Sequence, residues 1–248
     1  MKRYLEDKNR IQIYQDVFET VKTIEKISAS KLHFLKQRVK SLSVYTETLE
    51  KILIRLLCFH RPNHPFLEKS REGKKALLVI TGQKGLVGGL YHTLVNYALS
   101  IPLKNCHLMV VGSKGKKYFK EEKIKISQTF LDFSELPDFE EVDFITKYTF
   151  EKFLRGEFSR VDILYSHFVS VIEQRPLIVG FLPFSSELIE RDKTTSQDIF
   201  GMPIFDPSPQ EVFNQLLKKY IQIFLYRIVL EAKLSEFSAR TVNTENAW

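Results

Sequence analysis

The first 61 residues of the chain contain neither glycine nor proline, and this run ends only at Pro62. A stretch of this length is long for an ordinary helix. Stepping alternately by three and four residues from Ile11 meets mostly apolar side chains, and the exceptions are Glu25, Ser28 and Thr46. This seam comprises Ile11, Tyr14, Phe18, Val21, Glu25, Ser28, Leu32, Leu35, Val39, Leu42, Thr46, Leu49, Leu53 and Leu56. The sequence therefore predicts one coiled-coil helix, roughly 90 Å long.

The other end of the chain carries a matching pattern. Ser208, Pro209 and Glu211 have the spacing of a capping box with proline at the first helical position. No glycine or proline follows before Trp248, and a second seam is interrupted only by Arg227. That seam comprises Phe213, Leu216, Tyr220, Ile223, Leu230, Leu234 and Phe237. Because the chain returns, we expect the two terminal helices to form a long antiparallel coiled coil.

Between the two helices the pattern changes to short apolar runs that alternate with helical segments. Predicted strands cover residues 76–81, 107–111, 161–165 and 177–184, and predicted helices cover residues 90–99, 114–122 and 139–154. Such alternation favours an α/β fold with a mainly parallel, Rossmann-like sheet. Residues 187–201 are polar and are interpreted as a connection. The predicted organisation is a helix at 1–61, an inserted α/β domain at 62–207 and a second helix at 208–248.

Composition excludes several classes of protein. No run approaches the roughly 18 apolar residues of a membrane-spanning helix, so no membrane insertion is expected. The N-terminal segment carries acidic residues and lacks a continuous apolar stretch, so it does not have the pattern of a secretory signal. Cys58 and Cys106 are too few for a disulfide scaffold, which favours a reducing compartment. The net charge of +7 indicates an acidic partner without identifying it.

Residues 82–89 form a glycine-rich segment after the first predicted strand, where an α/β fold can hold a phosphate. The segment lacks the lysine and hydroxyl residues of a P-loop, because Leu90 and Tyr91 follow its last glycine. The three-glycine spacing of dinucleotide-binding folds is absent too. The segment is therefore interpreted as a tight turn or a protein contact loop, and no nucleotide or other cofactor is assigned to it. A second glycine turn at 112–116 also lacks the full motif.

None of the remaining candidate sites has a combination of residues that indicates catalysis. His60 and His64 are separated by Pro62 and lack acidic or cysteine ligands, so a turn is favoured over a metal site. Ser166 and His167 lack the glycines of a nucleophile elbow, which argues against a hydrolase. An acidic group is interpreted as a solvated loop and helix start, and it comprises Asp132, Glu135, Asp138, Glu140, Glu141 and Asp143.

A basic stretch in the first helix leaves three interpretations open. Its cations are Lys22, Lys26, Lys31, Lys36, Arg38 and Lys40, against Glu25 as the one acid. The stretch can be a solvated helix face. A nucleic-acid surface requires stacking aromatics, and only Phe34 meets that requirement, so no nucleic acid is expected. The third interpretation is a helix that runs through a collar of acidic subunits.

Several segments together resemble the gamma subunit of F-type ATP synthases, the central rotor shaft. Residues 22–32 resemble the family's first-helix motif, 64–68 the loop that leaves it, and 79–90 its strand and glycine signature. Further blocks match at 165–170, 181–184 and 205–208, and residues 235–240 resemble the Ser-Glu-x-x-Ala-Arg motif of the last helix. Gln83 and Lys84 replace the family's usual Asp-Arg pair, and Val87 replaces its cysteine. The family's last helix continues for roughly 35–40 residues beyond the motif, or about 55 Å.

The resemblance implies a non-catalytic shaft that couples its rotation to ATP synthesis or hydrolysis and to proton translocation. The implied partners are the alpha and beta subunits of a catalytic hexamer, the epsilon subunit and a membrane ring of c subunits. ATP and magnesium would bind those other subunits, and this chain would sit peripherally at the cytoplasmic face of the membrane. The resemblance assigns subunit contacts to Ile24, Lys26, Lys31, Lys84, Phe205, Asp206 and Arg240.

Two alternatives remain at this point. The chain can be the shaft of a specialised F-type-like ATPase motor that is not coupled to ion transport. It can instead be a free nucleotide-binding α/β protein with a coiled-coil arm. Detection of c-ring and epsilon partners separates the first alternative from a synthase, and direct ATP binding by the isolated chain would support the second.

Overall fold

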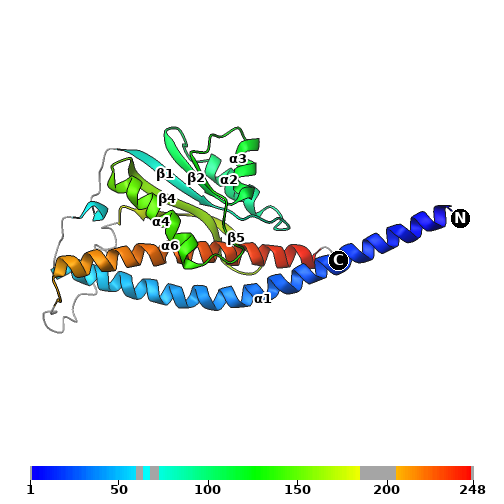
Figure 1. Cartoon of the computed structure of the whole chain (residues 1–248), viewed down its shortest axis with the longest axis horizontal. Helices are drawn as coiled ribbons and strands as arrows, with labels where there is room; N and C mark the ends of the chain where they lie inside the picture. Colours follow the sequence, from blue (N-terminus) through cyan, green and yellow to red (C-terminus); the bar gives the residue numbers. More distant parts are fainter. Residues whose placement is uncertain (1, 60–63, 68–72, 185–204, 247–248) are drawn as a thin grey trace.

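A computed structural model describes residues 2–59, 64–67, 73–184 and 205–246. The long α1 (Lys2–Phe59) and α6 (Pro209–Glu245) run antiparallel and lie side by side (Figure 1). A five-stranded sheet and its helices pack on the side of α6 that faces away from α1. The molecule is therefore a mixed α/β protein in which α6 lies between a sheet and a second long helix.

The sheet has the strand order β3-β2-β1-β4-β5. Its strands are β1 (Lys74–Ile80), β2 (Cys106–Val111), β3 (Gln128–Phe130), β4 (Phe158–Phe168) and β5 (Gln174–Leu182). Neighbours among the first four pair in parallel, and β5 returns antiparallel to β4 as a hairpin. The expectation of a mainly parallel sheet is confirmed. The sequence missed the short β3, because three residues carry too little apolar pattern to predict a strand.

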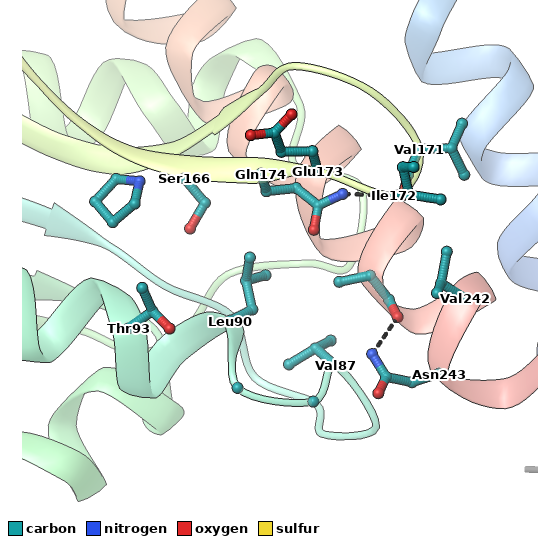
Figure 2. A pocket seen from close by; sticks show the side chains of 14 residues that line it. Val87, Leu90, Thr93, Ser166, Val171, Ile172, Glu173, Gln174, Val242 and Asn243 are labelled. Carbon is teal, nitrogen blue, oxygen red and sulfur yellow. Dashed lines mark hydrogen bonds between the residues drawn. The ribbon is translucent and has the colours of Figure 1, made fainter. Parts of the chain in front are cut away.

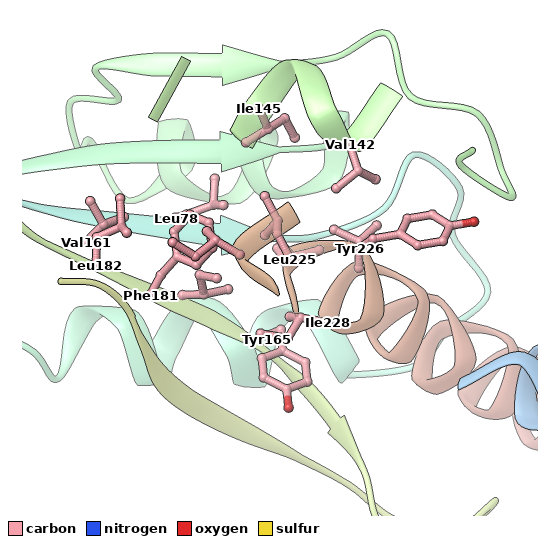
Figure 3. Packing of buried hydrophobic residues seen from close by; sticks show 14 of the residues in the cluster. Leu78, Val142, Ile145, Val161, Tyr165, Phe181, Leu182, Leu225, Tyr226 and Ile228 are labelled. Atoms are coloured by element: carbon pink, nitrogen blue, oxygen red, sulfur yellow. The ribbon is translucent and has the colours of Figure 1, made fainter. Parts of the chain in front are cut away.

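The remaining elements cover the two faces of the sheet. They are the 3₁₀ turn η1 (Pro65–Leu67) and the helices α2 (Leu90–Leu99), α3 (Ser113–Glu121) and α4 (Phe139–Leu154). Side chains alternate along each strand, so Leu77 and Val79 pack against α2 and α3 while Leu78 and Ile80 face α4 and α6. Figure 3 shows the second of these layers, in which Leu225 and Ile228 of α6 lie against the strands.

Side chains cap the N-termini of α6 and α4, and the sequence predicted the first of these two caps. The Ser208 side chain accepts a hydrogen bond from the backbone of Glu211, with Pro209 in the first turn of α6. Asp138 and Glu141 form a reciprocal capping box at the start of α4. The acidic group that we interpreted as a solvated loop therefore contains residues that fix a helix terminus.

The predicted seam of α1 is buried over only part of its length. From Ser28 onward its residues are buried or pack against the core beside α6. Ile11, Tyr14 and Phe18, in contrast, are 58%, 73% and 50% exposed. This N-terminal part of α1 projects past the end of α6 (Figure 1). No helix among the described residues has the length and apolarity that a membrane span requires.

Two earlier expectations lie outside the described residues. The polar connection at 187–201 falls within residues 185–204, and His60 belongs to the undescribed residues 60–63. His64 is described, and it packs against the rings of Phe66 and Phe213. That environment is consistent with the turn that the sequence favoured over a metal site.

Candidate functional site

The glycine turn (residues 82–89) connects β1 to α2 and lies against the C-terminal half of α6. Gly88 adopts φ +55°, and a Cβ atom there would lie 2.7 Å from the side-chain oxygen of Asn243. At Gly82 a Cβ atom would lie 2.5 Å from the carboxylate of Glu236. Any larger residue at these two positions would push the turn off the helix. The glycines therefore serve close contact with α6, in agreement with a structural turn.

A network of charged side chains joins this turn to α1, to α6 and to the loop before α4. We call it the Glu135–Glu236 network, and its members are Lys31, Lys84, Glu135, Lys233, Glu236 and Arg240. Lys31 Nζ lies 2.5 Å and Lys84 Nζ 3.1 Å from one oxygen of Glu135. Four cations against two carboxylates leave the network with two surplus positive charges.

The α6 side of this network is almost fully removed from water. Glu236 accepts hydrogen bonds from Lys233 Nζ at 2.9 Å and from Arg240 Nη2 at 2.7 Å. These three side chains are 3–4% exposed. Arg240 also donates from Nε to the carbonyl of Gly85, which fixes the glycine turn to the helix. Burying one partner without the other would leave an uncompensated charge, so the three side chains act as a unit.

One nitrogen of the Arg240 guanidinium group makes no hydrogen bond to the described residues. Its Nη1 atom is buried and has no hydrogen bond within the described part of the chain. A carboxylate oxygen of Glu135 lies 3.9 Å away, which is within ion-pair range but too far for a hydrogen bond. Glu135 is therefore shared among Lys31, Lys84 and Arg240, and it links three separate elements.

Two ionisable groups in this region have displaced pKa values. Burial tends to raise the pKa of Glu135, but hydrogen bonds and charges from Lys31 and Lys84 outweigh it and lower that pKa. Burial, followed by the negative charge of Glu236, raises the pKa of Tyr91 well above its ordinary value. Glu135 is thus ionised and Tyr91 neutral at physiological pH.

A second buried carboxylate, Glu231, fixes the sheet to α6. It accepts hydrogen bonds from the Tyr165 hydroxyl at 3.3 Å and from Arg227 Nη1 at 3.4 Å, and it also pairs with His167. Burial, followed by the charge of Glu231, raises the pKa of Tyr165. Arg227, which interrupts the predicted seam of α6, is thus a structural partner of this carboxylate.

A cavity of about 330 Å³ opens beside the glycine turn (Figure 2). Val87 and Leu90 line one side, Ile172 of the β4–β5 hairpin another, and Val242 and Asn243 of α6 a third. Ser166 also lines this cavity, whereas its neighbour His167 pairs with Glu231 on the opposite side of β4. The two side chains therefore cannot act together as a nucleophile and base. Ile172, which lines the cavity, is 83% exposed.

The structure brings together three of the seven residues that the resemblance assigns to subunit contacts. Lys31, Lys84 and Arg240 meet in the Glu135–Glu236 network. Ile24 and the exposed Lys26 lie earlier on α1, while Phe205 and Asp206 precede α6 at the far end of the helix pair. None of these positions has been tested as a contact, so each remains a prediction.

The sequence did not identify Glu135, Lys233, Glu236 or Glu231 as structural groups. The available signal was the spacing of Lys233, Glu236 and Arg240, which places all three on one helix face. A prediction based on one apolar seam of α6 assigns this face to the solvent. It is buried because α6 is covered on two sides. Among the described residues no group of three or more metal-ligating side chains occurs.

The chain is similar to known proteins over almost its whole length. A family model described as ATP synthase matches residues 5–248. The ATP synthase gamma chain of Moorella thermoacetica is 30% identical over 244 residues, which cover 97% of this chain and 84% of that protein. The gamma chain of Desulfitobacterium hafniense is 29% identical and covers 94% of this chain and 82% of that protein.

Solved structures share the fold. The central stalk and c-ring structure of the Tetrahymena thermophila mitochondrial ATP synthase contains a chain that superposes with a TM-score of 0.63. The match covers 92% of this chain and 99% of that chain at 18% identity. A rotor chain of the Euglena gracilis mitochondrial ATP synthase gives a TM-score of 0.51, also at 18% identity.

We expect the substitution Glu236→Gln to destabilise the fold by about 3 kcal/mol, because Lys233 and Arg240 would stay buried without their carboxylate. The free energy of unfolding from urea denaturation measures the effect. Glu19→Gln is the matched control, since Glu19 is exposed on α1, and it should change stability by less than about 0.5 kcal/mol. Equal effects of the two substitutions would contradict the structural role of the network.

Glu135 should make stability depend on pH. Because its pKa is lowered in the folded chain, its contribution is present above its ordinary value of 4.5 and is lost as the pH falls through the lower folded value. The stability difference between the parent and Glu135→Gln should therefore be constant near neutral pH and shrink as the pH falls below 4.5. Denaturation curves at several pH values test this, and a difference that does not change with pH would refute it.

Proposed function

The chain belongs to the family of ATP synthase gamma chains, and on that premise we propose how it works as the rotor of an F-type ATP synthase. The rotor couples rotation to ATP synthesis or hydrolysis in an alpha–beta hexamer and to proton translocation. In this proposal the chain is not itself catalytic. ATP and magnesium bind the other subunits.

The pairing of the terminal helices supports the proposal of a shaft. We assign residues 1–61 and 208–248 to an antiparallel coiled coil and residues 62–207 to an inserted Rossmann-like domain. The seam of α1 is buried or half-buried from Ser28 onward, and that of α6 is buried or half-buried throughout. A long helix pair with a domain on one side is an asymmetric object. Its rotation would present different contacts to otherwise equivalent catalytic sites.

Coupling then follows from differential contact. A hexamer site that meets one side of the shaft has a different conformational equilibrium from a site that meets another side. Rotation exchanges these environments in turn, and by linkage a change of nucleotide state at the sites drives the shaft. This coupling requires a rigid shaft. The burial of α6 and its ion pairs support such rigidity.

The proposed contact with the ring is supported by the N-terminal part of α1. This part projects past α6 and has exposed apolar and basic side chains. Ile24 and Lys26 lie at the start of the covered segment, and Lys22 is exposed nearby. Apolar side chains of this kind would pack inside a surrounding ring, while the lysines would meet acidic groups on its inner wall. Within the proposal, alpha and beta subunits supply that wall.

The other contacts lie farther along the shaft. Lys84 is exposed at the glycine turn, where the Glu135–Glu236 network carries surplus positive charge, and it would meet an acidic segment at the exit of the ring. Phe205 and Asp206 lie at the opposite end of the helix pair and would approach the epsilon subunit and the c-ring. In this arrangement the chain is peripheral and acts at the cytoplasmic face of the membrane.

Reversing two charges on the projecting part of α1 should weaken assembly. The double substitution Lys22→Glu, Lys26→Glu should reduce the affinity for a purified alpha–beta ring about tenfold, since like charges would face one another. Both lysines are exposed and lie outside the Glu135–Glu236 network, so the fold should be unaffected. Native mass spectrometry of mixtures at several ring concentrations gives the affinity.

The matched control is Lys51→Glu with Arg55→Glu, which makes the same change of charge on an exposed part of α1 near the opposite end. It should leave ring assembly unchanged. If both double variants assemble as well as the parent, the basic face of α1 does not contact the ring. If neither parent nor variant binds a ring at all, the proposed function fails.

A further inference from the structure

Helix α3 and the turn after it carry a concentration of lysines that the rotor function does not use. The segment from Ser113 to Ile126 contains two acids and six lysines, which are Lys114, Lys116, Lys117, Lys120, Lys123 and Lys125. Among the described residues, these lysines form one ion pair, in which Lys117 Nζ lies 3.8 Å from a carboxylate oxygen of Glu121. The net charge of this short segment is therefore more than half of the +7 of the whole chain.

The lysines surround a groove with an apolar floor. A surface hollow of about 370 Å³ is lined by Lys116, Lys120, Lys123 and Lys125, with Ile124 and Ile126 between them. The two isoleucines are half-buried and pack against the core on this side of the sheet. We call this hollow the α3 groove. Four lysines and two isoleucines thus line the α3 groove.

The backbone of the groove is held firmly. Lys123 has φ +57°, a left-handed conformation that glycine or asparagine adopts at lower cost at the end of a helix. The amide groups of Lys123 and Ile124 donate to the carbonyls of Lys120 and Phe119 and so complete a helix-ending motif. Phe119 is fully buried. The groove is therefore a preformed feature of the fold.

Compensation of the helix dipole does not require so many cations. One or two positive side chains in the last turn suffice, and their effect fades beyond that turn. Lys116 lies in the first half of α3, and Lys125 lies beyond its end. Self-repulsion among these groups costs stability unless a negative partner approaches. The α3 groove also lies on the sheet face opposite to α6, away from the helix pair.

We propose that the α3 groove binds an acidic segment of a partner protein, whose carboxylates meet the lysines and whose apolar side chain rests on Ile124 and Ile126. Charge complementarity selects the acidic partner. The aliphatic floor favours a polypeptide over nucleic acid, because no exposed aromatic ring lines the groove for base stacking. This inference does not depend on the rotor function.

The test uses the full chain and a short fluorescent peptide of repeating Glu-Glu-Leu units, with binding followed by anisotropy. The double variant Lys120→Glu, Lys123→Glu should bind the peptide at least about tenfold more weakly than the parent. The control Lys51→Glu, Arg55→Glu makes the same charge change on exposed positions of α1 outside its basic stretch, and it should bind within about twofold of the parent. Equal losses in the two variants would mean that net charge alone attracts the peptide, and would overturn the proposal.

Two further probes separate the possible partners. A peptide of Glu-Glu-Ser units keeps the charges but lacks the apolar side chain, and it should bind several-fold more weakly if the isoleucines form the floor. Equal binding of the two peptides would overturn the role of the floor. Vesicles of phosphatidylglycerol and single-stranded DNA complete the set. Tighter binding of either one, lost in the Lys120–Lys123 variant, would identify a membrane or a nucleic acid in place of a protein partner.

Discussion

The burial of α6 between α1 and the sheet is the constraint on which the rest of the structure depends. Because α6 is covered on two sides, its charged as well as its apolar residues are out of water, and each buried charge needs a partner. Glu236 accepts hydrogen bonds from Lys233 and Arg240, and Glu231 accepts them from Tyr165 of the sheet and from Arg227. These pairs fix the rotation of α6 about its axis and its position along the sheet.

The same pairs connect elements that are far apart in the sequence. Arg240 holds the glycine turn through Gly85, and Glu135 joins α1 to this turn. A displacement of α1 would therefore be transmitted to the turn through charged contacts of 2.5–3.1 Å. For a rotor that transmits torque between its helices and its domain, such cross-links supply stiffness where apolar contacts alone would allow sliding.

The sequence predicted the secondary structure of this chain well because its periodic patterns are long. Residues 90–99 and 139–154 form helices within their predicted limits, and Ser208 caps α6 as its motif requires. The apolar pattern could not reveal that α6 is buried on two sides. A charged residue is counted as polar in such a pattern, whether its side chain faces water or a buried carboxylate. Glu135 was interpreted as solvated for the same reason, since its partners Lys31 and Lys84 are distant in sequence. The resemblance selected Lys31, Lys84 and Arg240 without the carboxylates that join them.

Direct observation of rotation would show whether this chain is the shaft. An alpha–beta complex that contains this chain can be fixed to a surface, with a probe attached to a cysteine introduced at Leu154, which is 53% exposed on α4. We expect stepwise rotation of the probe in one direction while ATP is hydrolysed. Sustained hydrolysis by the intact complex with a stationary probe would contradict the assignment of this chain as the shaft.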